Sequence, residues 1–121
     1  MRKIFVIVTL LSMYLLYSGW VYTSGTASLR VMPDAAVKGK QIWQEKNCQN
    51  CHQIFGLGGY MGPDLTTVVS DRYRGRMYAK GMLMNGGSRM PNFHFSEQQV
   101  TELIAYLDYV NSIGNTKIHN N

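Results

Sequence analysis

The pattern of apolar and polar positions divides this 121-residue chain into an apolar N-terminal stretch and a mixed remainder. Residues 4–22 carry no charged side chain. A helix rises about 1.5 Å per residue, so a helix over this stretch crosses the roughly 30 Å hydrocarbon core of a bilayer. Arg2 and Lys3 precede the stretch, which favours a cytoplasmic N-terminus and an exported C-terminal part. We therefore predict a single membrane anchor in residues 1–22.

A cleaved signal peptide is the alternative interpretation of the same stretch. Small residues follow it at positions 26–28, but the apolar run is longer than the usual core of about 7–15 residues. The far end of the stretch also carries aromatic residues, as the interfacial belt of a membrane helix does, namely Tyr17, Trp20 and Tyr22. These features favour a retained anchor. Thr9, Ser12 and Ser18 are small hydroxyl residues within it, which either pack against a partner helix or simply face lipid.

The remaining residues predict a short polar linker, 23–32, and an all-α domain, 33–121. A first helix is expected from about residue 35 to 46 with Asp34 as its N-cap, and a second from 71 to 85. The clearest helix begins at residue 97 and continues to Val110, and Gly114 is expected to stop it. It follows a Ser96–Gln99 capping box and carries apolar residues at helical spacing, namely Val100, Leu103, Ile104, Leu107 and Val110.

Four positions in the first predicted helix carry information on packing. Its apolar side is expected to include Val37, Ile42 and Trp43. Gly39 interrupts the helix at a cost of up to about 1 kcal/mol relative to Ala. A glycine here is explained if another helix crosses at close range.

The residues Cys48-Gln49-Asn50-Cys51-His52 form a C-x-x-C-H motif, the attachment signature of c-type haem. Two thiols three positions apart reach neighbouring vinyl groups of one haem, and the adjacent imidazole reaches its iron. A structural zinc site needs four Cys or His ligands, and the other two histidines, His94 and His119, lie far away in the sequence. A thioredoxin-like dithiol would need a βαβ pattern, which is not visible here. We predict one covalently attached haem c with His52 as an axial ligand.

The second axial ligand is sought among the eight methionines. A thioether ligand raises the potential relative to a second imidazole, as suits an electron carrier. Met90 lies in a Gly-rich loop and is followed by Pro91, which stiffens the backbone at that point. Most of the others lie in the anchor or in predicted helices. We predict Met90 as the second ligand, with Met84 and His94 as alternatives.

The stretch after His52 is rich in glycine, which permits unusual dihedrals and close backbone approach to a flat ligand. A phosphate-binding loop would need a preceding strand and a following helix. Pro63 fixes a turn, and its carbonyl is predicted to accept the second ring N–H of His52, a contact that sets the orientation of a ligating imidazole.

The net charge of +5 comes from 12 basic and 7 acidic residues. With no basic helix or Gly-rich phosphate loop, this mild excess favours an ordinary solvated surface and no nucleic acid. The sequence leaves open whether Arg72, Arg74, Arg76 and Arg89 pair with a haem propionate, contact a partner protein or face solvent.

The order of helix, C-x-x-C-H, Gly-Pro-x-Leu loop, helix, Met-Pro loop and terminal helix resembles a class I cytochrome c. More narrowly, the chain resembles the cytochrome c subunit of bacterial nitric oxide reductase. That family carries C-x-x-C-H-x-x-x-G-x-G-x-Y-x-x-P-[DE]-L and Met-Pro-x-Phe. The matching positions here are Cys48, Cys51, His52, Gly56, Gly58, Tyr60, Pro63, Asp64, Leu65, Met90, Pro91 and Phe93. The stretch between Leu65 and Met90 is shorter than expected for that family.

The resemblance implies that the haem domain lies on the outer side of the bacterial inner membrane. A periplasmic cytochrome c or cupredoxin would supply electrons. A large membrane-embedded, haem-copper-type catalytic subunit would receive them and convert nitric oxide to nitrous oxide. The chain itself would carry no catalytic residue, and Tyr60 and Pro63 would help to bind the cofactor. The alternatives are a free-standing tethered carrier, a cytochrome c subunit of another haem-copper oxidase, and a gas sensor in which Met90 does not ligate.

Overall fold

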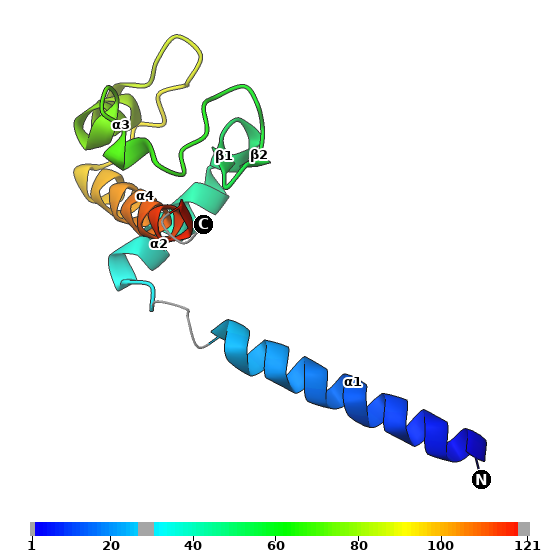
Figure 1. Ribbon diagram of the computed structural model, residues 1–121. Coiled ribbons are helices and arrows are strands. Elements are labelled where there is room, and N and C mark those ends of the chain that lie inside the picture. Colours follow the sequence, from blue (N-terminus) through cyan, green and yellow to red (C-terminus); the bar gives the residue numbers. More distant parts are fainter. Residues whose placement is uncertain (1, 27–30, 119–121) are drawn as a thin grey trace. The chain divides into compact units, whose positions relative to one another are not determined.

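The computed structural model describes residues 2–26 and 31–118, with the side chains of 25, 26 and 116–118 left aside. Predictions on Ala27, Ser28 and His119 therefore lie outside the described residues. The chain separates into two compact units, Met1–Val31 and Met32–Asn121. In order, the elements are α1 (Arg2–Thr26), α2 (Asp34–Glu45), the 3₁₀ turn η1 (Cys48–Asn50), β1 (Gln53–Ile54), β2 (Leu57–Gly58), the 3₁₀ turn η2 (Val68–Ser70), α3 (Gly75–Asn85) and α4 (Glu97–Ile118) (Figure 1).

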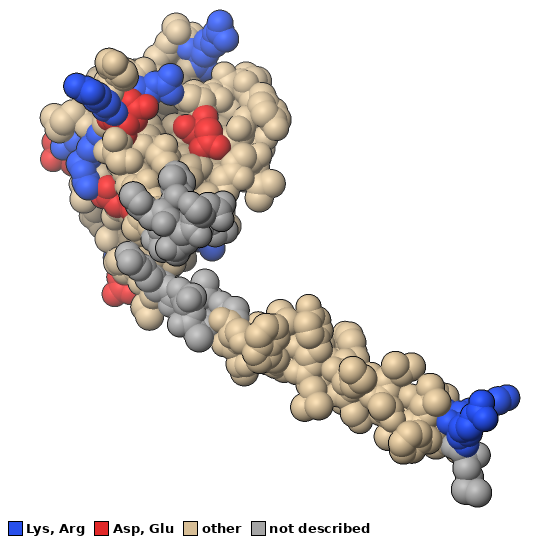
Figure 2. Space-filling view, viewed as in Figure 1, with Lys and Arg blue, Asp and Glu red and all other residues tan. Residues whose placement is uncertain are grey.

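The first unit is the single helix α1, which covers the predicted anchor and continues four residues beyond Tyr22, to Thr26. By length and composition, the helix over residues 2–24 is long and apolar enough to cross a membrane. Figure 2 shows its Lys and Arg side chains at its beginning only. Two of its hydroxyl groups donate to carbonyls one turn earlier, Thr9 to Phe5 and Ser12 to Val8. These hydroxyls are satisfied within the helix, so they give no support to a partner helix.

The second unit is built on the crossing of α2 and α4 (Figure 1). The helices meet at Gly39, where an added Cβ would lie 2.0 Å from the carbonyl oxygen of Glu102. The prediction of a close helix crossing at this glycine is confirmed. The prediction for Val37 is wrong, because its side chain is 39% exposed while Ala36 and Gly39 are buried. The core consists of Ile42, Trp43, Val68, Ala79, Val100, Leu103, Ile104, Tyr106, Leu107 and Val110.

Replacing Gly39 with alanine is expected to destabilise the domain. The new methyl group would overlap the α4 backbone at Glu102, and such overpacking costs about 1–3 kcal/mol. This outweighs the gain of up to about 1 kcal/mol in helix propensity. Denaturant unfolding of the haem-loaded chain measures the effect. Gly81→Ala is the matched control, because nothing lies within 4 Å of an added Cβ on this glycine of α3. Equal stability of the two variants would contradict the prediction.

The beginnings of α2 and α3 differ from the sequence predictions. Asp34 is the first residue of α2 rather than its cap, since Pro33 is extended and its carbonyl accepts the N–H of Val37 at 3.0 Å. The second helix begins at Gly75 rather than residue 71. The Asp71 carboxylate oxygen Oδ1 accepts the N–H groups of Tyr73 and Arg74, both at 2.8 Å, which holds a turn in place of helix.

The capping box before α4 is confirmed. The Ser96 N–H donates to Gln99 Oε1 at 3.0 Å, and the Gln99 N–H donates to Ser96 Oγ at 3.2 Å. The predicted stop at Gly114 is wrong, because α4 continues to Ile118. Gly114 is buried, and an added Cβ would lie 3.0 Å from the methyl group of Thr66. This glycine therefore serves the packing of α4 on the loop after β2.

Candidate functional site: the Cys48–His52 segment

The two cysteines are free thiols at the start and just after the end of η1. The carbonyl oxygen of Cys48 accepts the N–H of Cys51 at 3.2 Å and that of His52 at 2.9 Å, which closes the segment into a tight turn. Asn47 enters it with a left-handed backbone, φ 52°. Burial raises the pKa of the Cys48 thiol, so the group is protonated at neutral pH. The turn presents two sulfur atoms and an imidazole from one short segment.

His52 is held from several sides. Its Nδ1 lies 3.0 Å from the carbonyl oxygen of Pro63, the contact predicted from the sequence. Because a carbonyl only accepts, Nδ1 carries the proton and Nε2 keeps its lone pair for a metal. The Trp43 ring lies 6.4 Å from the imidazole between centroids, tilted by 48°. An added Cβ on Gly62 would lie 2.5 Å from His52 Cε1, so the backbone at Gly62 lies directly against the ring.

The Gly-rich loop wraps around the attachment segment. A Cβ added to Gly58 would lie 2.2 Å from the carbonyl oxygen of His52. A Cβ added to Gly59 would lie 1.8 Å from the carbonyl oxygen of Asn50. The Gly59 N–H donates to the Gln49 carbonyl at 2.8 Å, and the Gly62 N–H donates to that of Cys51 at 2.7 Å. Close approach was predicted toward a flat ligand. The structure shows that these glycines admit close approach to the chain's own backbone.

A two-stranded hairpin that the sequence did not predict follows His52. β1 and β2 pair antiparallel, with Ile54 opposite Leu57. The turn residues Phe55 and Gly56 both have positive φ, 55° and 74°, as a tight hairpin turn requires. The Asp64 carboxylate accepts the Gly56 N–H at 3.0 Å and the Thr66 N–H at 2.7 Å. Burial raises the pKa of Asp64, but the hydrogen bonds from Thr66 and Gly56 outweigh it and leave the pKa below its ordinary value.

Met90 lies half-buried in the loop between α3 and α4. Its carbonyl accepts the Gly87 N–H at 2.8 Å, and Gly86 has φ 72°, so residues 86–90 form a tight turn. An added Cβ on Gly87 would lie 2.6 Å from the methyl carbon of Met82. A second thioether, that of Met82 on α3, therefore lies against the turn that carries the predicted ligand Met90. Of the two alternatives predicted from the sequence, Met84 is 39% exposed and His94 has a left-handed backbone, φ 53°.

The donor set fits a covalently held haem. Within residues 2–26 and 31–118, no group of three or more His, Cys, Asp or Glu side chains converges as a metal site. A single imidazole whose Nε2 can bind a metal, two unpaired thiols and a thioether in a tight turn are the groups that suit one iron in a ring attached through sulfur. Large apolar side chains of the hairpin and the loop after it are exposed, as expected where a flat apolar group packs, namely Phe55, Leu57, Tyr60 and Met61. Met77 and Tyr78 on α3 are exposed as well.

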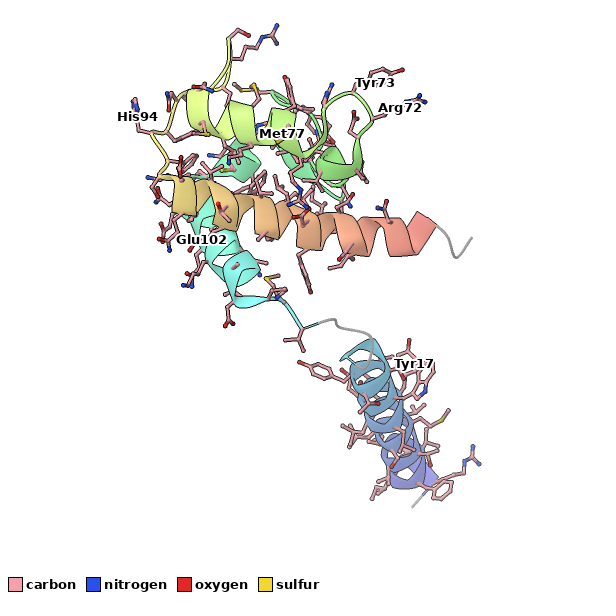
Figure 3. All side chains as sticks on the ribbon, turned by 90° about the vertical axis from the view of Figure 1, so that its left-hand side faces the viewer. Tyr17, Arg72, Tyr73, Met77, His94 and Glu102 are labelled. Atoms are coloured by element: carbon pink, nitrogen blue, oxygen red, sulfur yellow. The ribbon has the colours of Figure 1, made fainter. Side chains whose placement is uncertain are left out.

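The arginines differ from one another in the structure. Arg76 on α3 pairs with Asp108 on α4 at 2.6 Å, so it links two helices. Arg72 and Tyr73 project from the turn before α3, away from the helices (Figure 3). Arg89 is exposed in the Met90 turn. At 85% exposure Tyr60 points away from the packed core, and its role in cofactor binding stays a prediction.

Sequence reasoning missed Gly62, Asp64 and Thr66 as residues of this site. Asp and Thr two positions apart after Gly-Pro are a signal for side chains that bond to the backbone of a turn. The requirement for glycine at position 62 has no such signal, because its φ is not positive and only the neighbouring imidazole demands it.

Residues 34–107, well over half of the chain, match the family described as cytochrome c oxidase, cbb3-type, subunit III. The chain belongs to this family. The match includes α2, the Cys48–His52 segment and Met90, and it implies binding of c-type haem.

Curated relatives point to one member of the wider group, as the sequence resemblance did. The C subunit of nitric oxide reductase from Stutzerimonas stutzeri is 33% identical over 91 residues, 68% of this chain and 62% of that protein. The protein of the same name from Halomonas halodenitrificans is 27% identical over 110 residues, 80% of this chain and 73% of that protein. The C subunit from Paracoccus denitrificans is 25% identical over 91 residues, which are 65% of this chain and 61% of that protein. The chain thus spans less than two thirds of the length of the relatives from Stutzerimonas stutzeri and Paracoccus denitrificans. By sequence, this cytochrome resembles the C subunit of nitric oxide reductase.

Proposed function

We propose that this chain is the electron-transfer subunit of a membrane nitric oxide reductase. The observation that carries the proposal is the similarity to the C subunit of that enzyme, at 33% identity over 91 residues. One haem c, bound through Cys48 and Cys51, supplies a reversible one-electron centre. His52 and Met90 would hold its iron from this chain, so that substrate would find no open position on it.

In this proposal α1 anchors the chain and the domain lies on the outer side of the membrane. The basic residues Arg2 and Lys3 at the start of α1 support a cytoplasmic N-terminus. The domain takes one electron at a time from a donor protein and passes it to a large catalytic subunit. There two nitric oxide molecules, two electrons and two protons give one nitrous oxide and one water.

A second candidate follows from the family description, which names a subunit of a cbb3-type oxidase. In that case the same domain and the same haem ligands would deliver electrons to an oxygen-reducing subunit. The two candidates differ in what the partner consumes, and a single purification separates them.

The test is a detergent extraction of native membranes through an affinity tag at the C-terminus. We expect a large subunit with b-type haem to co-purify and the complex to consume nitric oxide with a reduced donor. Cys51→Ser is the control, since it breaks the attachment motif, and it should retain the partner but lose c-type absorption and most activity. Oxygen consumption without nitric oxide consumption would favour the oxidase. A monomer with only a low-spin c-type spectrum would contradict both and leave a tethered carrier.

A further inference from the structure

The Asp64 carboxylate joins two segments that flank the His52–Pro63 hydrogen bond. Oδ2 accepts the N–H of Gly56 in the hairpin turn at 3.0 Å, and Oδ1 accepts the N–H of Thr66 at 2.7 Å. Thr66 Oγ1 in turn accepts the N–H of Phe55 at 2.6 Å. We call these three hydrogen bonds the Asp64 clamp. It ties the β1–β2 hairpin to the segment that follows Pro63.

The clamp acts on a backbone conformation that is unfavourable by itself. Phe55 has a left-handed backbone, which residues with a Cβ rarely adopt, and such residues persist where surrounding contacts hold them. Both turn residues, Phe55 and Gly56, donate their N–H groups to the clamp. Losing the clamp is therefore expected to loosen the hairpin turn.

The hairpin adjoins His52 in the chain, and Asp64 of the clamp adjoins Pro63, so each is next to one partner of the imidazole hydrogen bond. His52 directly precedes β1, and Pro63 directly precedes Asp64. A backbone hydrogen bond from Leu65 N–H to the Gln53 carbonyl, at 2.9 Å, sets the two segments side by side. Fixing Asp64 against the hairpin therefore fixes the Pro63 carbonyl at 3.0 Å from His52 Nδ1.

We propose that Asp64 is a positioning residue for the axial imidazole and acts on it through the Pro63 carbonyl. The inference rests on the proposed role of His52 as an iron ligand. An N–H···O=C bond from the second ring nitrogen raises the basicity of a ligating imidazole and fixes its orientation. A more basic imidazole stabilises the oxidised iron. Loosening the clamp should therefore raise the reduction potential and let solvent reach the Nδ1 proton.

The substitutions separate the hydrogen bonds from the charge. Asp64→Asn removes the charge and one acceptor, because each carboxylate oxygen serves a different N–H. Asp71→Asn is the matched control: Asp71 Oδ1 alone accepts both of its N–H groups, so an amide oxygen keeps them while the charge is lost. Thr66→Val leaves the charge unchanged and removes the acceptor of the Phe55 N–H. Thr101→Val is its control, since the Thr101 hydroxyl bonds only within α4, to the Glu97 carbonyl.

The experiment uses the full haem-loaded chain in detergent. NMR follows the exchange of the His52 Nδ1 proton with solvent, and a redox titration gives the potential. We expect exchange to accelerate about tenfold in Asp64→Asn, as loss of one charge-assisted hydrogen bond implies, and less in Thr66→Val. Both variants should have a raised potential. The two controls should exchange within about twofold of the wild type.

Wild-type exchange rates in both Asp64→Asn and Thr66→Val would overturn the inference. Thr66→Val keeps the test decisive if Asp64→Asn does not fold. An absorption spectrum of the wild-type chain is recorded first. Absence of a low-spin c-type spectrum there would overturn the proposed function, and this inference with it. A normal spectrum with unchanged exchange would overturn the inference alone.

Discussion

Replacement of Met90 with alanine is expected to convert the haem from a six-coordinate low-spin state to one with an open or water-filled position. The loss of the thioether should also lower the reduction potential, because thioether ligation favours the reduced iron. The expectation rests on the tight turn that holds Met90. Its carbonyl accepts the Gly87 N–H at 2.8 Å, and Pro91 follows directly. Absorption and electron paramagnetic resonance spectra report the spin state, and a redox titration reports the potential.

Two methionine variants serve as comparisons for Met90→Ala. Met82 on α3 packs against Gly87 of the turn that holds Met90, so Met82→Ala tests a rival thioether. Met13→Ala is the control, because Met13 lies in α1, outside the unit that carries Cys48–His52 and Met90. Both should keep the low-spin spectrum, although Met82→Ala will cost stability through lost packing. A low-spin Met90→Ala together with a high-spin Met82→Ala would assign the ligand to Met82.

The elements with a strong local signal could be predicted from the sequence. The α4 stripe of Val100, Leu103 and Leu107 is buried, and the Ser96–Gln99 capping box has both of its hydrogen bonds. Gly39 within a helix indicated a close helix crossing, which α4 provides. In each case the local sequence pattern agrees with the fold around it, so few alternative structures of the segment have a comparable free energy.

The errors arise where a tertiary contact or a side chain competes with the local pattern. Asp71 bonds two backbone N–H groups and shortens α3, although the residues after it have helical propensity. Gly114 has the pattern of a helix stop, but packing against Thr66 explains it and α4 continues. Val37 has the right spacing for the core, yet its side chain is exposed, and Ala36 and Gly39 are the buried residues of this part of α2.

In the candidate site, too, residues with a local sequence signal could be predicted, and residues that depend on tertiary contacts could not. The Cys48–His52 motif carries its chemistry in the sequence, because its short spacing brings two thiols and an imidazole together. The contact of His52 with the Pro63 carbonyl, 11 residues later, was also predicted and is present at 3.0 Å. The roles of Gly62 and Asp64 depend on how residues 53–66 fold back over His52, and a sequence gives no distance between an absent Cβ and an imidazole. Such residues can be recognised only once the loop is placed in three dimensions.

Gly62 leads to the second large expected effect. A Cβ at this position would lie 2.5 Å from His52 Cε1 and 2.6 Å from Nδ1, inside van der Waals contact. The backbone of the attachment segment is fixed by hydrogen bonds, for example from Gly62 N–H to the Cys51 carbonyl at 2.7 Å. The imidazole must therefore turn away from Pro63. Gly62→Ala should cost about 1–3 kcal/mol of unfolding free energy, and Gly62→Val more.

The displaced imidazole distinguishes this effect from general destabilisation. Gly62→Ala should disturb the low-spin spectrum and lower the haem content per chain, which a pyridine haemochrome assay measures. Gly39→Ala should lose a similar amount of stability with an unchanged spectrum, because its clash is with the α4 backbone at Glu102. If Gly62→Ala behaved like Gly39→Ala, with lower stability and an intact spectrum, the glycine would serve only the packing of the loop. A spectral change confined to Gly62→Ala would instead show that the space at Gly62 belongs to the imidazole.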